Sequence, residues 1–222
     1  MKVAAFFDLD GTLVSVNTAS LWMKRERRLG RINLYQQFMA IFYMLCYRFG
    51  VVNIEEVTIK ALQTVKGLNE EEVRKWTHEW FEKEVTPYAA PDAFDAIKEH
   101  RNSGHILVLL TSASLYESEI AAKFFGMDAF LCSRYEVKDG VFTGGIILPL
   151  CYGHGKVIHA RNYASENNID LSISYFYSDS ITDLPMLMAV GNPRAVNPDF
   201  RLSREAKKRG WPILDWKSKV TK

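Results

Sequence analysis

Short apolar runs alternate with amphipathic stretches along most of this chain. The runs at residues 3–7, 105–110 and 173–177 have the length and composition of buried strands. Helical spacing predicts helices near residues 91–104, 115–125, 156–167, 183–189 and 200–209, the first of them capped by Asp92. Further strands are expected at 129–132, 195–196 and 212–214, with a hairpin over 135–147 that turns at Asp139-Gly140. Such alternation predicts an α/β fold in which helices cover a mostly parallel sheet.

One long stretch departs from this alternation. Between residues 16 and 86 the pattern is helical throughout, with segments near 18–29, 34–49, 54–65 and 69–85. Glycines separate these segments, and Pro87 marks the exit from the last one. The stretch is therefore predicted to be an inserted α-helical cap subdomain over 16–86, with residues 1–15 and 87–222 forming the core domain.

Composition narrows the class of protein. A chain of 222 residues with 48% hydrophobic and 24% charged residues suits a globular core with one insertion. The net charge of +2 and the lack of a DNA- or RNA-reading motif predict no nucleic-acid partner. Its three cysteines are odd in number and lack the paired spacing of a zinc site, so free thiols are expected. Together with an N-terminus that resembles a strand rather than a signal peptide, they predict a cytoplasmic protein.

The most apolar segment lies within the predicted cap, at residues 38–47 (FMAIFYMLCY). It contains ten residues, whereas a helix that spans a bilayer needs ~20. No stable membrane insertion is therefore expected, and the segment is interpreted as a buried or cleft-lining helix, with an interfacial helix as the alternative.

Two acidic residues follow the first apolar run. In an extended strand Asp8 and Asp10 project to the same side, while Leu9 points back toward the core. Gly11 then allows a turn. Two carboxylates this close repel each other unless a cation or a shared proton intervenes. An ordinary turn after a buried strand is the alternative interpretation, and only partners elsewhere in the chain can decide between them.

Such partners occur at the ends of other predicted strands. Thr111 ends the second strand, and Asp179 ends a later one with Asp183 four residues on. Lys156 lies at the start of a helix and can add a positive charge. Because ligands of open α/β sheets bind outside the carboxyl ends of the strands, these side chains are predicted to share one cleft with Asp8 and Asp10.

Four motifs now stand in order: DLDGT at 8–12, the apolar run that ends in Thr111, Lys156, and SDSITDLPML at 178–187. In this order they resemble the motifs of the haloacid dehalogenase-like (HAD) phosphohydrolases. Within that family the chain is similar to the phosphoserine phosphatase-like branch, in which a helical cap follows the first motif. The resemblance extends over essentially the whole chain and implies a Rossmann-like parallel sheet core.

The resemblance implies a chemistry for the two aspartates. Asp8 would attack a phosphate monoester and form an aspartyl-phosphate that water then hydrolyses. Asp10 would protonate the leaving alcohol and then activate the water. The protein would accordingly be a phosphatase that acts on a small phosphorylated metabolite.

The resemblance also implies the ligands of the reaction. Mg²⁺ would be held by Asp8, Asp179 and the backbone carbonyl of Asp10. Phosphoryl oxygens would be held by Lys156, by the Thr111 hydroxyl and by the N–H of Ser112. Thr111 is preferred over Ser112 as the motif hydroxyl because it directly follows the apolar run. Asp183 would contact neither the phosphoryl group nor the metal directly, but would support either the metal site or Lys156.

Substrate choice is not specified by these motifs. Phosphoserine phosphatases carry a glutamate soon after the first motif, whereas residues 15–18 here are Ser-Val-Asn-Thr. The cap offers a basic run at 24–31 and an aromatic helix at 35–49, which either contact the substrate or form a solvated face and a cap core. A phosphotransferase with the same intermediate and a non-catalytic binding module are the alternative functions, and no oligomeric state is predicted.

Overall fold

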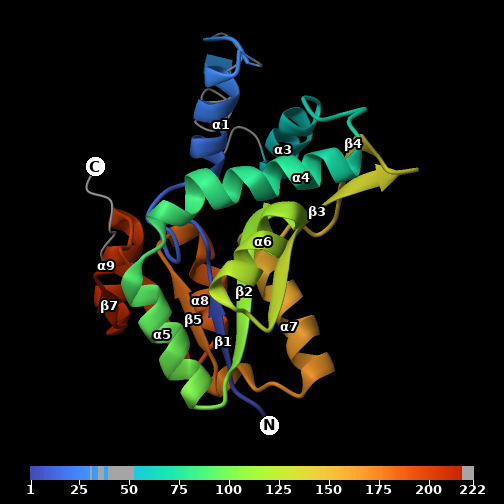
Figure 1. Ribbon diagram of the computed structural model, residues 1–222. Helices are drawn as coiled ribbons and strands as arrows, with labels where there is room; N and C mark the ends of the chain where they lie inside the picture. The colour runs from blue at the N-terminus through green and yellow to red at the C-terminus, as the bar shows by residue number, and fades with distance from the viewer. Residues whose placement is uncertain (31, 35–37, 40–52, 217–222) are drawn as a thin grey trace.

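A seven-stranded sheet forms the centre of the computed structural model, which describes residues 1–30, 32–34, 38–39 and 53–216 (Figure 1). The strand order is β4-β3-β2-β1-β5-β6-β7, and all neighbouring strands are parallel except β3 and β4. The strands are β1 (Ala4–Phe7), β2 (Ile106–Ser114), β3 (Ala129–Lys138), β4 (Val141–Ile147), β5 (Tyr175–Ser178), β6 (Asn192–Val196) and β7 (Ile213–Leu214). The predicted α/β class is confirmed.

Helices cover both faces of this sheet. Alternate side chains of β1 point to opposite faces of the sheet. Ala5 and Phe7 belong to the apolar cluster on one face, and Ala4 and Phe6 belong to the cluster on the other. The first cluster is closed by α5 (Pro91–Asn102) and α6 (Leu115–Phe125), and the second by α7 (His154–Asn167), α8 (Leu184–Ala189) and α9 (Phe200–Arg209). Two buried layers therefore fix the position of β1.

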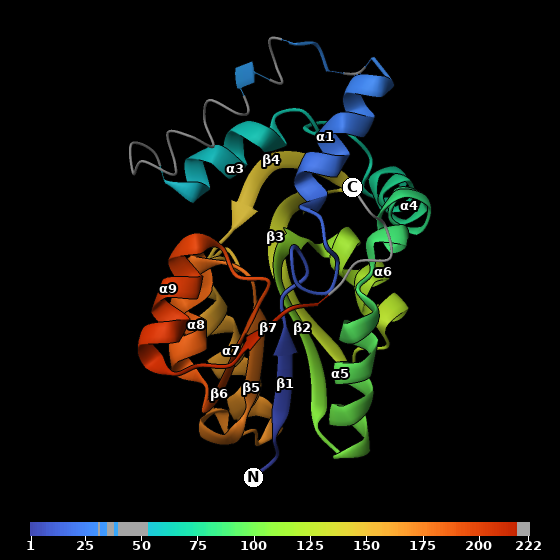
Figure 2. The ribbon, with the colours of Figure 1, turned by 90° about the vertical axis from the view of Figure 1, so that its left-hand side faces the viewer.

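The inserted segment forms helices above the carboxyl end of the sheet (Figure 2). These are α1 (Thr18–Arg28), α3 (Ile54–Leu62) and α4 (Glu70–Trp80), and a π-helical turn (Phe81–Val85) and a 3-10 turn (Thr86–Tyr88) lead back to the core. An asparagine side chain caps the N-terminus of each of the three α-helices. The helix predicted at 34–49 lies mostly outside the described residues, and the division at residues 16 and 86 stays a prediction.

The cap is joined to the hairpin β3–β4 by backbone hydrogen bonds. The N–H of Gly67 donates to the carbonyl of Phe142 at 2.9 Å, and the N–H of Phe142 donates to Leu68 at 3.1 Å. The N–H of Glu70 donates to the carbonyl of Gly140 at 2.8 Å. The loop between α3 and α4 is thus bonded to the hairpin tip, where Asp139 and Gly140 turn at φ values of 52° and 74° as predicted.

Three predictions of local structure were wrong. Strand β2 does not end at Thr111 but continues to Ser114, with a register irregularity after Leu110. Strand β3 is one continuous strand of ten residues, because its first half pairs with β2 and its second half with β4. Asp92 does not cap α5, since the helix begins at Pro91 with Ala90 in the capping position.

Two further observations concern the thiols and the membrane. Among the described residues, Cys132 and Cys151 are free and buried, as expected. No helix in this part of the chain has both the length and the apolar character needed to cross a bilayer. The predicted compartment and the predicted absence of a nucleic-acid partner stay predictions.

Candidate active site

The carboxyl ends of three neighbouring strands bring the predicted residues to one edge of the sheet. Phe7 of β1 lies beside Leu109 of β2 and Tyr177 of β5. One residue later, the N–H of Asp8 donates to the carbonyl of Tyr177 at 3.0 Å. Thr111 lies within β2 and Asp179 directly follows β5, so the topology brings these residues toward the same end of the sheet as Asp8.

Lys156 is the positive charge at this edge. It lies in the first turn of α7, and its Nζ donates to Asp8 Oδ1 and to Asp183 Oδ2, each at 2.7 Å. The Ser178 hydroxyl donates to the same oxygen of Asp183 at 2.8 Å. All four side chains are buried. Asp183 thus contacts Lys156, while its support of a metal site stays a prediction.

Burial and pairing set the charges of this group. Burial alone would lower the pKa of Lys156, but Asp183 and Asp8 outweigh that effect and raise it above its ordinary value. Burial also raises the pKa of Asp8 to about 7, although Lys156 favours the ionised form. A permanently protonated lysine is therefore fixed beside a carboxylate that takes up a proton near neutral pH.

Asp179 approaches the same turn from β5. An ideal Cβ on Gly11 would lie 2.1 Å from Asp179 Oδ2, so only a glycine admits this carboxylate beside the turn. Burial first, and then the nearby carboxylates of Asp8, Asp183 and Asp10, raise the pKa of Asp179 to about 8. When ionised, these carboxylates carry more negative charge than the single positive charge of Lys156 can neutralise. The site therefore favours an additional cation.

The donors at this edge suit a hard divalent cation. Asp8 and Asp179 offer carboxylate oxygens, and the Asp10 backbone carbonyl belongs to the turn that Asp179 contacts through Gly11. No three His, Cys, Asp or Glu side chains form a ready-made metal cluster within the described ranges. A site with two carboxylates, one carbonyl and several waters does not need such a cluster, and Mg²⁺ usually retains waters.

Asp10 is held by the start of α1. The Asn17 amide donates to Asp10 Oδ2 at 3.1 Å, and the N–H of Thr18 donates to Asp10 Oδ1 at 3.0 Å. Burial raises the pKa of Asp10, while its bonds to Thr18 act in the opposite direction. Both oxygens of its carboxylate are therefore bonded to the start of α1.

The two candidate hydroxyls of the second motif differ in environment. Thr111 is buried, and its hydroxyl accepts the N–H of Ala113 at 3.1 Å. Ser112 is the next residue of β2 and is exposed. Neither side chain makes a described hydrogen bond to Asp8 or Lys156, so their predicted roles toward phosphate stay predictions.

Three residues of this region were not singled out from the sequence. Glu117 lies in the first turn of α6, where burial and then Asp10 raise its pKa to about 8, and its Oε1 has no hydrogen-bond partner among the described residues. Asp199 caps α9 and accepts the N–H of Ile181, which fixes the loop after Asp179. Ser178 supports Asp183. Asp199 directly precedes a helix as an N-cap does, Ser114 and Glu117 have the spacing of a capping box, and Ser178 lies in the fourth motif, but none of these signals indicated a contact with the acidic cluster.

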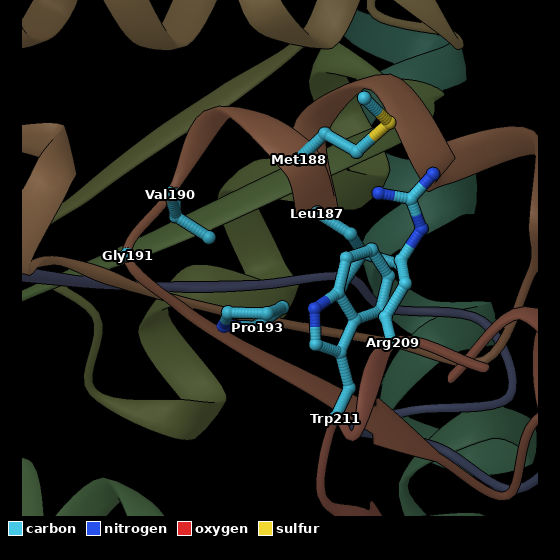
Figure 3. Close-up of a pocket in the computed structure, with 7 residues that line it drawn as sticks. All are labelled: Leu187, Met188, Val190, Gly191, Pro193, Arg209 and Trp211. Carbon is cyan, nitrogen blue, oxygen red and sulfur yellow. The ribbon is translucent and has the colours of Figure 1, made fainter. Parts of the chain in front are cut away.

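A cavity of about 250 Å³ lies elsewhere (Figure 3). It is lined by Leu187, Met188, Val190, Gly191, Pro193, Arg209 and Trp211. Gly191 and Pro193 stand at the amino end of β6, whereas Asp8 and Asp179 stand at carboxyl ends of strands parallel to it. The cavity is therefore at the opposite edge of the sheet from the acidic cluster, and it contributes no group to that cluster.

Curated proteins of known sequence resemble the chain over nearly its full length. The "Inhibition of morphological differentiation protein" of Streptomyces azureus is 33% identical over 219 residues, which are 97% of this chain and 79% of that protein. A histidinol-phosphatase of Neisseria meningitidis is 28% identical over 98% of this chain and all of its own length.

Solved structures resemble it in fold. A Bordetella pertussis protein of unknown function superposes with a TM-score of 0.88 at 28% identity, covering 97% of this chain and 99% of that one. A phospho-aspartyl intermediate analogue of phosphoserine phosphatase superposes with a TM-score of 0.71 at 22% identity, covering 98% and 94%.

The family model of the haloacid dehalogenase-like hydrolases matches residues 5–188, which include Asp8, Thr111, Lys156 and Asp179. The match spans well over half of the chain. The resemblance predicted from the four motifs, and with it the prediction of an enzyme, is thereby confirmed. The chain belongs to the haloacid dehalogenase-like hydrolase family.

Proposed function

We propose that this hydrolase is a Mg²⁺-dependent phosphatase that cleaves a small phosphate monoester through an aspartyl-phosphate on Asp8. The observation that carries the proposal is the buried contact of Lys156 with both Asp8 and Asp183. This contact keeps a positive charge beside the carboxylate that would meet an anionic substrate. A curated relative named histidinol-phosphatase and a solved phospho-aspartyl analogue of phosphoserine phosphatase support it.

In this proposal each residue of the site has a separate role. Asp8 attacks phosphorus, and Lys156 stabilises the negative charge on the phosphoryl oxygens while it orients Asp8. Asp10 donates a proton to the leaving alcohol and later removes one from the attacking water. Thr111 and the N–H of Ser112 hold phosphoryl oxygens. Bound Mg²⁺ supplies further charge neutralisation, held by Asp8, Asp179 and the carbonyl of Asp10.

The test of the activity is a panel of phosphorylated metabolites and aryl phosphates, assayed by phosphate release with Mg²⁺ and with a chelator. We expect hydrolysis of at least one class of monoester, and loss of that hydrolysis in the chelator. Phosphate release that is replaced by a new phosphate ester when an acceptor alcohol is added would identify a phosphotransferase instead. No turnover of any member of the panel would contradict the proposal.

Asp8→Asn is the most direct test of which residue is the nucleophile. It removes the nucleophilic oxygen, so we expect turnover to fall by ~10³-fold or more while the protein stays folded. Asp95→Asn is the matched control, because it makes the same change at an exposed position of α5 and is expected to retain full activity. Near wild-type turnover in Asp8→Asn would assign the nucleophile to another residue.

A further inference from the structure

The side chain of Asn17 makes two different kinds of contact. Its Oδ1 accepts the N–H of Ser20 at 2.9 Å and the Ser20 hydroxyl at 2.8 Å, which caps α1. Its Nδ2 donates to Asp10 Oδ2 at 3.1 Å. The orientation of the amide follows from this network, since the oxygen must face the N–H of Ser20 and the nitrogen must then face Asp10.

Asp10 is thus held at both oxygens by the first turn of one helix. Asn17 binds Oδ2 and the N–H of Thr18 binds Oδ1. The positive end of the α1 dipole favours a carboxylate in the same place. Rotation of the Asp10 side chain would break at least one of these bonds, so the contacts fix the direction in which Asp10 presents an oxygen.

We propose that Asn17 is a positioning residue for the reaction, one that holds Asp10 in the orientation in which it protonates the leaving alcohol. This inference rests on the proposed function, in which Asp10 is the general acid. Because Asn17 lies at the start of α1, the proposal links the placement of the acid to the placement of that helix.

A purely structural role is the competing interpretation, in which Asn17 only caps α1. Asn69 shows what capping alone requires: its Oδ1 accepts the N–H groups of Glu71 and Glu72 at the start of α4. Capping therefore uses the oxygen of the amide, whereas the contact with Asp10 uses the nitrogen. Variants that keep an accepting oxygen but lose the nitrogen separate the two roles.

The experiment compares wild type with Asn17→Ser and Asn17→Asp. Both replacements are good N-cap residues, so α1 is retained. Aspartate has no donor and repels Asp10, and serine has only one hydroxyl on a shorter side chain in place of the amide nitrogen and oxygen. Activity is measured as kcat/KM for a series of aryl phosphates whose leaving phenols range from strongly to weakly acidic. This constant reports the step in which the phenol leaves, before the intermediate is hydrolysed.

If Asp10 is displaced, kcat/KM should fall most for substrates whose leaving phenol must be protonated as it departs. For the weakly acidic phenols we expect kcat/KM of both variants to fall by about tenfold or more, and for the strongly acidic ones to stay within about threefold of wild type. Asn69→Ser, with the same change at the cap of α4, is expected to leave the whole series unaffected. Circular dichroism and melting temperature confirm that each variant is folded.

The outcomes separate this inference from the proposed function. An equal loss for every leaving group in both Asn17 variants would overturn the positioning role. If Asp10→Asn shows the dependence on leaving group but the Asn17 variants do not, Asp10 remains the acid and only the role of Asn17 fails. If Asp10→Asn lacks that dependence, the role proposed for Asp10 fails, and the inference fails with it.

Discussion

Lys156 connects two acidic residues of the site. It is a buried cation between two buried carboxylates, and its Nζ donates to both of them. Removing one partner of such a buried pair typically costs about 3–5 kcal/mol, because the remaining charge loses its compensation. The residue therefore supports folding of the site as well as its charge.

The acidic residues around Lys156 predict how metal binding depends on pH. In the metal-free protein the pKa of Asp179 is raised to about 8 and that of Asp8 to about 7, so the folded state holds protons that the unfolded state has released. The resulting stability is complete below about pH 4 and is lost as the pH rises through about 7 and 8. Mg²⁺ competes with these protons for the same oxygens.

We therefore expect Mg²⁺ to raise the melting temperature more at pH 8.5 than at pH 6, two values on either side of about 7–8. Thermal unfolding with and without Mg²⁺ at both pH values measures the difference. Asp179→Asn is the control, since it removes one ligand and one titrating group and should abolish most of the effect. An equal shift at the two pH values would contradict this assignment of the metal ligands.

At the residue scale, the sequence predicted the end of the sheet at which the candidate site residues lie, but it specified few of their contacts. Strand alternation and the carboxyl-end rule were enough to bring Asp8, Lys156 and Asp179 together. The bond between Lys156 and Asp8 joins residues 148 positions apart, and its direction depends on how α7 packs against α8, β2 and β3. The burial of Glu117 beside Asp10 likewise depends on tertiary packing that no local pattern encodes.

Among the elements, the turn after β1 requires a glycine for two reasons, its backbone conformation and the space beside it. Gly11 has a φ of +68°, and an added Cβ would lie 2.1 Å from Asp179 Oδ2. Gly11→Ala should therefore cost about 1–2 kcal/mol in backbone strain and also displace Asp179. We expect Mg²⁺ affinity and kcat/KM to fall by at least about tenfold, measured by calorimetry and by phosphate release.

Gly104→Ala separates strain from displacement. Gly104 has a similar φ of +73°, but nothing lies within 4 Å of its added Cβ. Both variants should lose the stability that backbone strain costs, whereas only Gly11→Ala should also displace Asp179 and lose metal affinity. Wild-type affinity in Gly11→Ala would remove Asp179 from the proposed metal site.

Element boundaries were predictable where local signals were strong. Helix α6 ends at Gly126 in the left-handed conformation, and α9 begins after Asp199, whose side chain accepts the N–H of Leu202. The length of β3 was not predictable, because it exists as one strand only through two partners on different parts of the sheet. Pairing partners are a tertiary property, which explains why this strand was predicted in two pieces.

Over the whole molecule, Phe142 is one of the residues through which the inserted helices contact the rest of the chain. Its ring is buried and packs edge-to-face on Tyr116 of α6, at 5.6 Å between ring centroids, and its backbone exchanges two hydrogen bonds with the cap loop. Phe142→Ala is expected to cost about 3–5 kcal/mol in the free energy of unfolding. It should also speed hydrogen exchange of the Gly67 and Glu70 amides by at least about tenfold.

Urea unfolding and amide exchange measure these two effects. Val141→Ala is the control, because its side chain is more than a third exposed and lies next to Phe142 on the same strand. It is expected to change the stability by less than about 1 kcal/mol. Unchanged exchange at Gly67 and Glu70 in Phe142→Ala would mean that the cap loop is held independently of this side chain.

The bonded hairpin has a consequence for engineering this enzyme. Strands β3 and β4 rise from the sheet that carries Asp8, and their tip is bonded to the loop between α3 and α4 (Figure 2). The hairpin is thus a spacer between the reaction centre and one side of the cap. Shortening both strands by two residues, which keeps every remaining side chain on its face of the hairpin, would lower that anchor by about 6.6 Å. Changing the length of the hairpin should therefore change the space between the inserted helices and Asp8, where the leaving group would lie. No residue proposed to contact phosphate would be altered.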